Sequence, residues 1–141
     1  MNIETGNSTK LIAAADVLWQ KVFIDEQGVP ADEVCDGLNE MSVHSVVFDG
    51  LLPVATARAT KCDESWRIGL VAVDKSMRGK GLGEKVMQAA INYISSCGGG
   101  EIILSAQQQV QGFYEKLGFE QSGEVTVFES GFVLVPMRRS T

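Results

Sequence analysis

One stretch of the sequence decides how the chain folds: Val71-Ala-Val-Asp-Lys-Ser-Met-Arg78-Gly79-Lys80-Gly81-Leu82-Gly83. An apolar run breaks here into a basic, glycine-rich turn, and a helical pattern follows. Glycines allow a backbone to approach a phosphate closely, and the N–H groups at a helix start favour an anion. Because Arg78 and Lys80 add formal positive charge, the stretch predicts a strand, a loop that binds a pyrophosphate, and a helix.

Two familiar phosphate-binding motifs do not fit this loop. A Walker A motif requires Gly-x-x-x-x-Gly-Lys-Ser/Thr, whereas Asp74 stands five positions before Gly79 and Gly81 follows Lys80. The dinucleotide motif Gly-x-Gly-x-x-Gly fails because Glu84 stands where its third glycine belongs. Neither a P-loop nucleotide nor a dinucleotide is therefore the expected ligand.

The pattern that remains is Arg78-x-x-Gly81-x-Gly83. It resembles the Arg/Gln-x-x-Gly-x-Gly/Ala acyl-coenzyme A loop of the GNAT acetyltransferase superfamily. A second segment, Phe113-Tyr114-Glu115-Lys116-Leu117-Gly118-Phe119, follows after a helix-length pattern and one strand-like run. It resembles the tyrosine-bearing motif of the same enzymes. Chance is a poor explanation for both motifs in this order and at this spacing.

Length and composition indicate one domain, residues 1–141. The chain has 141 residues, of which 45% are hydrophobic and 21% charged, and this is enough for a core of its own. No apolar stretch approaches the roughly 18 residues of a membrane span, and the first residues lack the basic and apolar regions of an export signal. We therefore expect a cytoplasmic protein without a membrane partner.

Cysteine usage and charge exclude other classes of protein. Cys35, Cys62 and Cys97 are odd in number and contain no Cys-x-x-Cys pair, which favours reduced thiols over disulfides or a zinc site. The single histidine and the scattered carboxylates form no metal-ligand pattern, so we expect no metal. A formal net charge of -6 disfavours nucleic acid as a partner, but it tolerates an amine substrate.

Hydrophobic periodicity and turn signals predict the order of the elements. Helices are expected from Ser8 or Thr9 to about Gly28, from Leu82 to Gly98, and from Gln108 to Gly118. Strands are expected at 43–48, 51–60, 66–73 and 101–106 and in a closing hairpin of 125–128 and 132–137, with a loop at 31–41. The run 66–73 is too apolar for simple alternation and should be the central strand.

This order predicts an α/β (α+β) fold with a mixed sheet. The GNAT resemblance narrows it to a mostly antiparallel, twisted sheet that is flanked by helices and has a splayed central strand. Residues 22–30 (Val-Phe-Ile-Asp-Glu-Gln-Gly-Val-Pro), His44 and Ala106-Gln107 further resemble the YjcF-like subgroup. Where relatives usually carry Gly-Ile-Pro-His, this chain has Gly131-Phe132-Val133-Leu134, so Leu134 replaces a polar group on the acceptor side.

The resemblance implies a binding site for acetyl-coenzyme A. In GNAT enzymes exposed main-chain groups of the central strand bind the pantetheine arm, and the glycine loop binds the pyrophosphate. Gln107 takes the place of an asparagine that often contacts the pantetheine. The positions implied to bind the coenzyme are Val71, Val73, Arg78, Gly79, Lys80, Gly81, Leu82, Gly83, Gln107 and Phe113.

By the same resemblance, Tyr114 protonates the coenzyme thiolate as it leaves. A phenol with a pKa of about 10 is a plausible donor to a thiolate within hydrogen-bond reach. The alternative is a helix tyrosine that only packs beside Phe113 and Phe119.

The general base is open. Many relatives carry a glutamate on the central strand, but residues 66–73 contain no carboxylate. Glu26, on the segment that lines the acceptor cleft in this fold, is the first candidate, and a solvated helix end is its alternative interpretation. Asp25, Glu33 and Asp36, a water molecule, and His44, which alternation places on a buried strand face, are the other candidates.

These features together predict an acetyl-coenzyme A-dependent N-acetyltransferase. An unidentified primary amine, on a small molecule or a protein, would attack the thioester directly in a ternary complex. The alternatives are a noncatalytic acyl-coenzyme A sensing domain and a protein-interaction module without nucleotide affinity. The sequence does not identify the acceptor, and it leaves a homodimer open.

Overall fold

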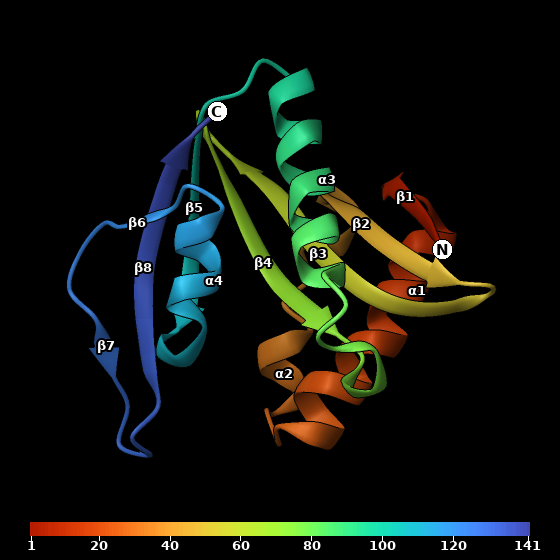
Figure 1. Ribbon diagram of the computed structural model, residues 1–141, viewed down its shortest axis with the longest axis horizontal. Helices are drawn as coiled ribbons and strands as arrows, with labels where there is room; N and C mark the ends of the chain where they lie inside the picture. Colours follow the sequence, from red (N-terminus) through yellow and green to blue (C-terminus); the bar gives the residue numbers. More distant parts are fainter.

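The computed structural model describes residues 1–141, apart from the side chain of Glu33. One twisted sheet runs through the molecule, with α3 and α4 on one face and α1 and α2 on the other (Figure 1). Its strands follow the order β1-β2-β3-β4-β5-β8-β6, and β7 also pairs with β8. The strands are β1 (Asn2–Gly6), β2 (Ser42–Asp49), β3 (Leu52–Cys62), β4 (Ser65–Val73), β5 (Glu101–Gln107), β6 (Glu120–Gln121), β7 (Thr126–Val127) and β8 (Val133–Ser140).

The helices largely follow the predicted capping signals. Ser8 caps the first helix, since its Oγ accepts a hydrogen bond from the Leu11 N–H at 3.3 Å. Three glycines with positive φ, at 98–100, follow the end of α3. The helices are α1 (Thr9–Trp19), the π-helix η1 (Gln20–Glu26), α2 (Ala31–Val34), α3 (Leu82–Ser96) and α4 (Gln111–Lys116), with 3₁₀ turns at Asn39–Met41, Lys75–Met77 and Gln108–Val110. None of the helices in the described chain is both long and apolar enough to cross a membrane.

The predicted fold class is confirmed, with three local corrections. Residues 2–6 form an edge strand paired with β2, which the short N-terminal pattern did not predict. Residues 31–34 form a helical turn after Pro30, inside a segment predicted to be a loop. The first helix is α-helical only to Trp19 and continues as a π-helix.

The central strand β4 diverges from β5. All neighbouring strands are antiparallel except these two, which run parallel and pair only through Ser65–Arg67 and Glu101–Ile103. Beyond Arg67 the two strands separate, and residues 68–73 keep a strand partner only on the β3 side. The splay therefore leaves one edge of β4 open over residues 68–73.

A bulge in β4 accompanies this divergence. The β3–β4 register shifts between Thr56 and Arg58, and Leu70 adopts a φ of 49°, a left-handed conformation that is uncommon for leucine. The Leu70 carbonyl accepts a hydrogen bond from Nε1 of the buried Trp19 at 3.0 Å. Trp19 thereby satisfies a backbone group at the bulge and fixes the position of β4 relative to α1.

Candidate active site

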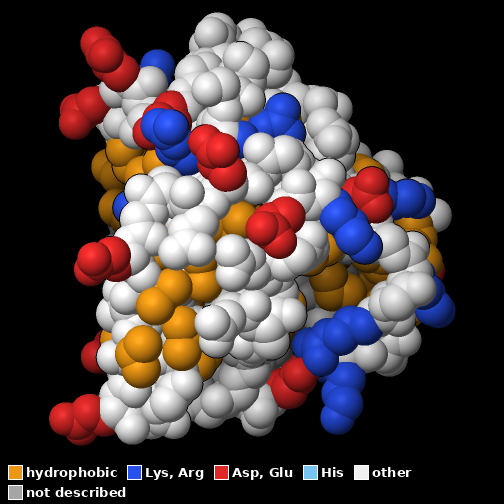
Figure 2. Space-filling model, turned by 60° about the vertical axis from the view of Figure 1, so that its left-hand side comes forward, with side chains coloured by type: hydrophobic (Ala, Val, Ile, Leu, Met, Phe, Trp, Pro, Cys, Tyr) orange, Lys and Arg blue, Asp and Glu red, His pale blue; other side chains and the backbone are white. Residues whose placement is uncertain are grey.

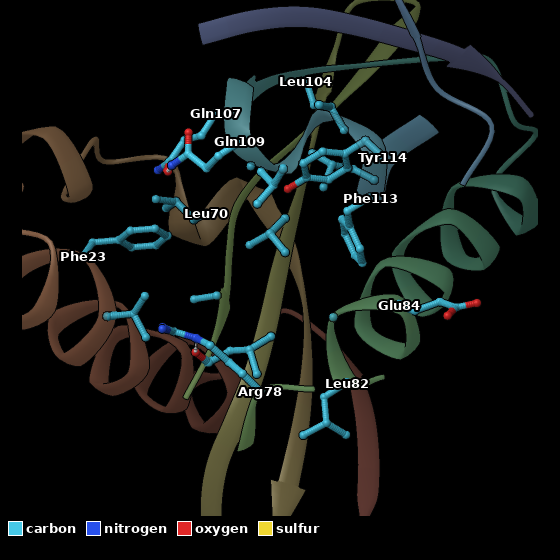
Figure 3. A pocket seen from close by; sticks show the side chains of 18 of the residues that line it. Phe23, Leu70, Arg78, Leu82, Glu84, Leu104, Gln107, Gln109, Phe113 and Tyr114 are labelled. Carbon is cyan, nitrogen blue, oxygen red and sulfur yellow. Dashed lines mark hydrogen bonds between the residues drawn. The ribbon is translucent and has the colours of Figure 1, made fainter. Parts of the chain in front are cut away.

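A cavity of about 830 Å³ lies between the separated strands. Its walls come from residues 68–73 of β4, the end of β5, the loop before α3, and Phe113 and Tyr114 of α4. Figure 3 shows Arg78 and Leu82 at one end of this cavity and Tyr114 at the other. In Figure 2, Lys and Arg side chains gather around a hollow with partly hydrophobic walls. The cavity volume lies within the range of small-molecule and cofactor sites.

The glycine loop adopts a backbone that other residues would resist. Gly79 and Gly81 have φ of 81° and 76°, and a Cβ at either position would meet nothing within 4 Å. Gly81 is the N-cap of the 15-residue α3 and no side chain caps this helix, so its first N–H groups are free to bind an anion. A Cβ at Gly83 would lie 3.3 Å from Phe113 Cζ, so glycine here lets α3 pack closely against α4.

The structure brings most of the predicted coenzyme residues together. Val71, Val73, Arg78, Gly79, Gly81, Leu82, Gly83, Gln107 and Phe113 all line the cavity. Lys80 lies outside this lining: it is exposed, and its Nζ is 3.9 Å from Met77 Sδ. Glu84 lines the cavity, but Figure 3 shows its carboxylate turned away from the centre.

Two ion pairs fasten the glycine loop to η1. Lys21 Nζ lies 2.6 Å from Asp74 Oδ2, and the Asp74 side chain is almost fully buried. The Ser76 N–H donates to Asp74 Oδ1 at 3.0 Å. Lys21 and then Ser76 lower the pKa of Asp74 to about 2. Arg78 forms a bidentate pair with Glu26, at 2.7 and 2.8 Å.

The Glu26–Arg78 pair constrains what Glu26 can do as a base. The hydrogen bond and the charge of Arg78 lower the pKa of the Glu26 carboxyl below its ordinary value. Arg78 also donates through Nε to the Val73 carbonyl at 3.1 Å, which holds the pair against the end of β4. Glu26 must therefore leave Arg78 before its carboxylate is free to accept a proton from another group.

None of the candidate bases whose side chains are described, Glu26 included, lines the cavity. His44 is completely buried, Nε2 lies 3.0 Å from the Asn39 carbonyl oxygen, and burial lowers the pKa of its ring. Asp36 forms a bidentate pair with Arg58 at 2.6 and 2.8 Å, and Arg58 lowers the pKa of this carboxyl. Asp25 is exposed and does not line the cavity. The Glu33 side chain lies outside the described part of the chain.

Tyr114 is a buried side chain at the inner end of the cavity. Its ring centroid lies 5.0 Å from Phe113 and 6.2 Å from Phe119, both in edge-to-face geometry. Burial raises the pKa of the Tyr114 hydroxyl to about 12. Figure 3 shows this hydroxyl directed into the cavity. The packing predicted as the alternative and an orientation suited to proton donation are therefore both present in one side chain.

A second cavity, of about 680 Å³, adjoins the first. The two share Gln27, Gln107 and Gln109, whose amides are linked: Gln109 Nε2 donates to Gln107 Oε1 at 2.7 Å, and Gln107 Nε2 to Gln27 Oε1 at 3.4 Å. Leu134, which the resemblance placed on the acceptor side, lines the second cavity. The sequence analysis assigned no role to Gln27, Gln109 or Phe23; the available signals were the run of glutamines at 107–109 and, for Phe23 and Gln27, the resemblance of residues 22–30 to the subgroup.

Among the described residues, no group of three or more His, Cys, Asp or Glu side chains could hold a metal ion. The site can bind an anion at one end, accommodate an extended chain along the open edge of β4, and offer a phenol at the other end. The second cavity, which adjoins the first at Gln27, Gln107 and Gln109, can hold a second molecule.

Comparisons with known proteins agree with this geometry. The family description "Acetyltransferase (GNAT) domain" matches residues 19–141. The uncharacterized N-acetyltransferase YjcF of Bacillus subtilis is 34% identical over 120 residues, which cover 85% of this chain and 86% of that protein. Glucosamine 6-phosphate N-acetyltransferase of Arabidopsis thaliana is 26% identical over 113 residues, or 80% and 76% of the two chains.

Solved structures share the same architecture. An acyl-CoA N-acyltransferase from Pseudomonas aeruginosa has a TM-score of 0.87 and 27% identity, with 98% of both chains covered. An aminoglycoside 6'-N-acetyltransferase solved with coenzyme A has a TM-score of 0.78, covering 99% of this chain and 97% of the other, and at 17% identity it shows the fold alone.

Proposed function

This chain belongs to the GNAT acetyltransferase family, and from that premise we propose that it transfers an acetyl group from acetyl-coenzyme A to a primary amine in a ternary complex. One observation carries the proposal. The cavity that begins at the glycine loop ends at the Tyr114 hydroxyl, and a second cavity opens beside it. A thioester held in the first cavity would meet an amine held in the second without an acyl-enzyme intermediate.

The donor half of the site suits coenzyme A. The pyrophosphate would accept hydrogen bonds from the N–H groups that Gly81 presents at the start of α3, with Arg78 as the nearby cation. The pantetheine arm would follow the open edge of β4 at Val71 and Val73, because this edge has backbone groups without a strand partner. Gln107 lies at the far end of this path, where its amide can contact the arm.

Tyr114 is the proposed general acid. As the amine nitrogen forms its bond to the acetyl carbon, the carbon–sulfur bond breaks and negative charge develops on sulfur. A phenol with a pKa of about 12 stays protonated throughout the physiological range. It therefore donates a hydrogen bond to the leaving sulfur and supplies the proton that yields the free thiol.

Glu26 is the proposed proton acceptor for the amine, acting through water. In the structure Glu26 is paired with Arg78, and a bound pyrophosphate would compete for that arginine. Coenzyme binding would thereby release the carboxylate and raise its pKa toward the ordinary value. An amine that is already neutral when it binds would need no such base.

A noncatalytic acyl-coenzyme A sensing domain is the second candidate. It is favoured by the scarcity of acidic groups: Glu84 is the one carboxylate among the described residues that line either cavity, and it faces away. The sensing domain predicts coenzyme binding without turnover.

A single assay separates the two candidates. Acetyl-coenzyme A is incubated with the protein and a panel of primary amines, and free thiol and acetylated amine are both measured. An enzyme releases thiol only when an acceptor is present, and Tyr114→Phe slows this release. A sensing domain is stabilised by acetyl-coenzyme A against heat but releases no thiol with any amine.

Residues 1–141 are proposed to act as one domain in the cytoplasm. All three cysteines are free and exposed in the described chain, which suits a reducing compartment. The acceptor of the Arabidopsis relative carries a phosphate. Because no Lys or Arg is among the described residues lining the second cavity, we do not extend that acceptor to this chain.

A further inference from the structure

The second cavity is uncharged. Among the residues that the structure describes, its ten lining residues include no Asp, Glu, Lys, Arg or His. The apolar part of its wall consists of Val29, Pro30, Phe128, Phe132 and Leu134. Its polar part consists of Ser130 and the three linked glutamines, and these glutamines lie where the cavity meets the coenzyme site.

Two phenylalanines give this cavity an open aromatic wall. Phe128 and Phe132 flank the β7–β8 turn, with ring centroids 5.9 Å apart and planes tilted by 49°. Their exposed fractions are 46% and 40%, so both rings are half open to solvent. The Phe128 N–H donates to the Phe132 carbonyl at 2.8 Å, which fixes the backbone between them. Figure 2 shows hydrophobic side chains gathered on the surface of this part of the molecule.

The sheet sets the distance between the amide end and the apolar end. Gln107 of β5 and Leu134 of β8 are register partners, and Leu134 also pairs with Thr126 of β7. Gln107 therefore lies on the strand next to β8, and the turn that carries Phe128 and Phe132 leads directly into β8. A ligand that spans the cavity would place one end at the glutamines and the other at the rings.

Charge decides what such a cavity accepts. An ammonium group that enters it would give up part of its water without gaining a carboxylate, and a phosphate would do so without gaining a cation. A flat apolar ring, in contrast, gains contact with two aromatic side chains and covers surface that is otherwise exposed. Neutral amides can hold an uncharged amino group by hydrogen bonds.

We propose that the acceptor is an aromatic amine that is uncharged at working pH, with its ring against Phe128 and Phe132 and its amino group at the three glutamines. This inference rests on the proposed acetyl transfer for its chemistry, and it names the acceptor class. It also accounts for the few acidic groups of the site, because a neutral amine can attack a thioester without first losing a proton to a base. As the amide forms, nitrogen passes one proton to water while Tyr114 protonates the departing sulfur.

Four amines distinguish the effect of an aromatic ring on binding from the effect of a positive charge. Aniline is aromatic and neutral, benzylamine is aromatic and cationic, cyclohexylamine is cationic without an aromatic ring, and spermidine is a polycation. Their affinity for the coenzyme A-loaded protein is measured by calorimetry, and product by mass spectrometry. We expect aniline to bind most tightly, by about tenfold or more over cyclohexylamine, and spermidine to bind least.

A charge placed in the cavity should reverse this order. Ser130 lines the cavity from the exposed β7–β8 turn, so Ser130→Asp is expected to fold. It should weaken the binding of aniline and strengthen the binding of benzylamine. Ser130→Asn, which has the shape of aspartate without its charge, should preserve the parental order of affinities. Phe132→Leu should weaken both aromatic amines and leave acetyl-coenzyme A affinity unchanged.

The outcomes distinguish this inference from the proposed function. If spermidine or an amino sugar is bound and acetylated better than aniline, the acceptor class is wrong and the transferase activity stands. If aniline binds in the expected order but is never acetylated, the ligand class stands and the sensing domain replaces the transferase. If no aromatic amine binds the coenzyme-loaded protein up to its solubility limit, the inference is overturned.

Discussion

The two cavities differ in how their side chains hold a ligand. The coenzyme cavity begins at a loop where glycines expose backbone N–H groups and where two ion pairs, Lys21–Asp74 and Arg78–Glu26, tie the loop to η1. The neighbouring cavity has no charged side chain among its described lining residues, and linked amides and aromatic rings form much of its wall. The first cavity suits a highly charged co-substrate that is the same in every reaction. The second suits a neutral molecule and can change with few consequences for the fold.

The largest effect is expected at Tyr114, at the inner end of the first cavity. Tyr114→Phe removes only the hydroxyl and keeps the ring between Phe113 and Phe119. We expect kcat to fall by about 100-fold to 10,000-fold, the usual contribution of one general acid, with acetyl-coenzyme A affinity nearly unchanged. Steady-state kinetics and calorimetry test this. Tyr93→Phe, in the other tyrosine, is the matched control; parental turnover in Tyr114→Phe would reduce Tyr114 to packing.

The next largest effect is expected at the glycine loop, where the first cavity begins. Gly83→Asp adds a carboxylate where the pyrophosphate would bind and a Cβ that must displace the Phe113 ring. We expect acetyl-coenzyme A affinity to fall by at least about tenfold, since the new carboxylate would repel the pyrophosphate. Thermal shift with the coenzyme measures this, provided that the unliganded variant melts near the parent. Gly123→Asp is the control, because a Cβ there makes only an ordinary 3.6 Å contact with Pro136; an unchanged shift in folded Gly83→Asp contradicts the loop assignment.

A smaller effect is expected at Glu26. It pairs with Arg78 of the glycine loop, and it is proposed to accept a proton from the amine. Glu26→Gln should lower kcat/KM by about tenfold, because water can partly replace a base. Since the Glu26 pKa is lowered from 4.5, any acidic limb that it causes lies below that pH in the unliganded protein. Acetyl-coenzyme A should bind at least as tightly, because Arg78 loses a competitor.

The pH–rate profile and the coenzyme affinity of Glu26→Gln are measured beside those of Asp25→Asn, an exposed neighbour. A weaker coenzyme affinity with an unaltered acidic limb would mean that Glu26 only orients Arg78. The two cavities would then differ more clearly, since no residue of the glycine-loop end would take part in the deprotonation of the amine.

The smallest effect concerns stability. The Asp74 pKa is lowered from 3.8 to about 2, so the folded state holds this proton less tightly than the unfolded chain. The carboxylate therefore stabilises the fold above pH 3.8, and this contribution is lost as the pH falls toward 2. Asp74→Asn should cost about 1–2 kcal/mol at neutral pH, after allowance for the largely exposed Lys21.

Urea unfolding of parent and Asp74→Asn from pH 7 to pH 2 tests this expectation. The difference between the two proteins should shrink over the acidic part of the range, and Asp25→Asn should show no comparable difference. A constant difference at all pH values would assign the effect to packing rather than to charge.

The glycine loop could be predicted from the sequence because the residues that form it are close together in the chain. Gly79, Gly81 and Gly83 lie within ten residues of the end of the apolar strand β4, and Gly79 and Gly81 adopt the positive φ that favours glycine. The second cavity as a whole could not be predicted, since its lining combines residues from 27–30, 107–109 and 128–134, which are far apart in the sequence and meet only in the fold. Leu134 was singled out only through the resemblance, and β1 was missed because five residues at a sheet edge carry little pattern.

The π-helix η1 has a consequence for how this protein can evolve. A π-turn is an α-helix with one residue too many, and its hydrogen bonds are poorer than those of an α-helix. Deleting one residue within Gln20–Glu26 would restore regular bonding and gain stability. It would also turn everything that follows by about one residue of helical rotation, roughly 100°, and carry Gln27 away from Gln107. The extra residue thus persists as a compromise in which thermal robustness is given up for the junction between the two cavities.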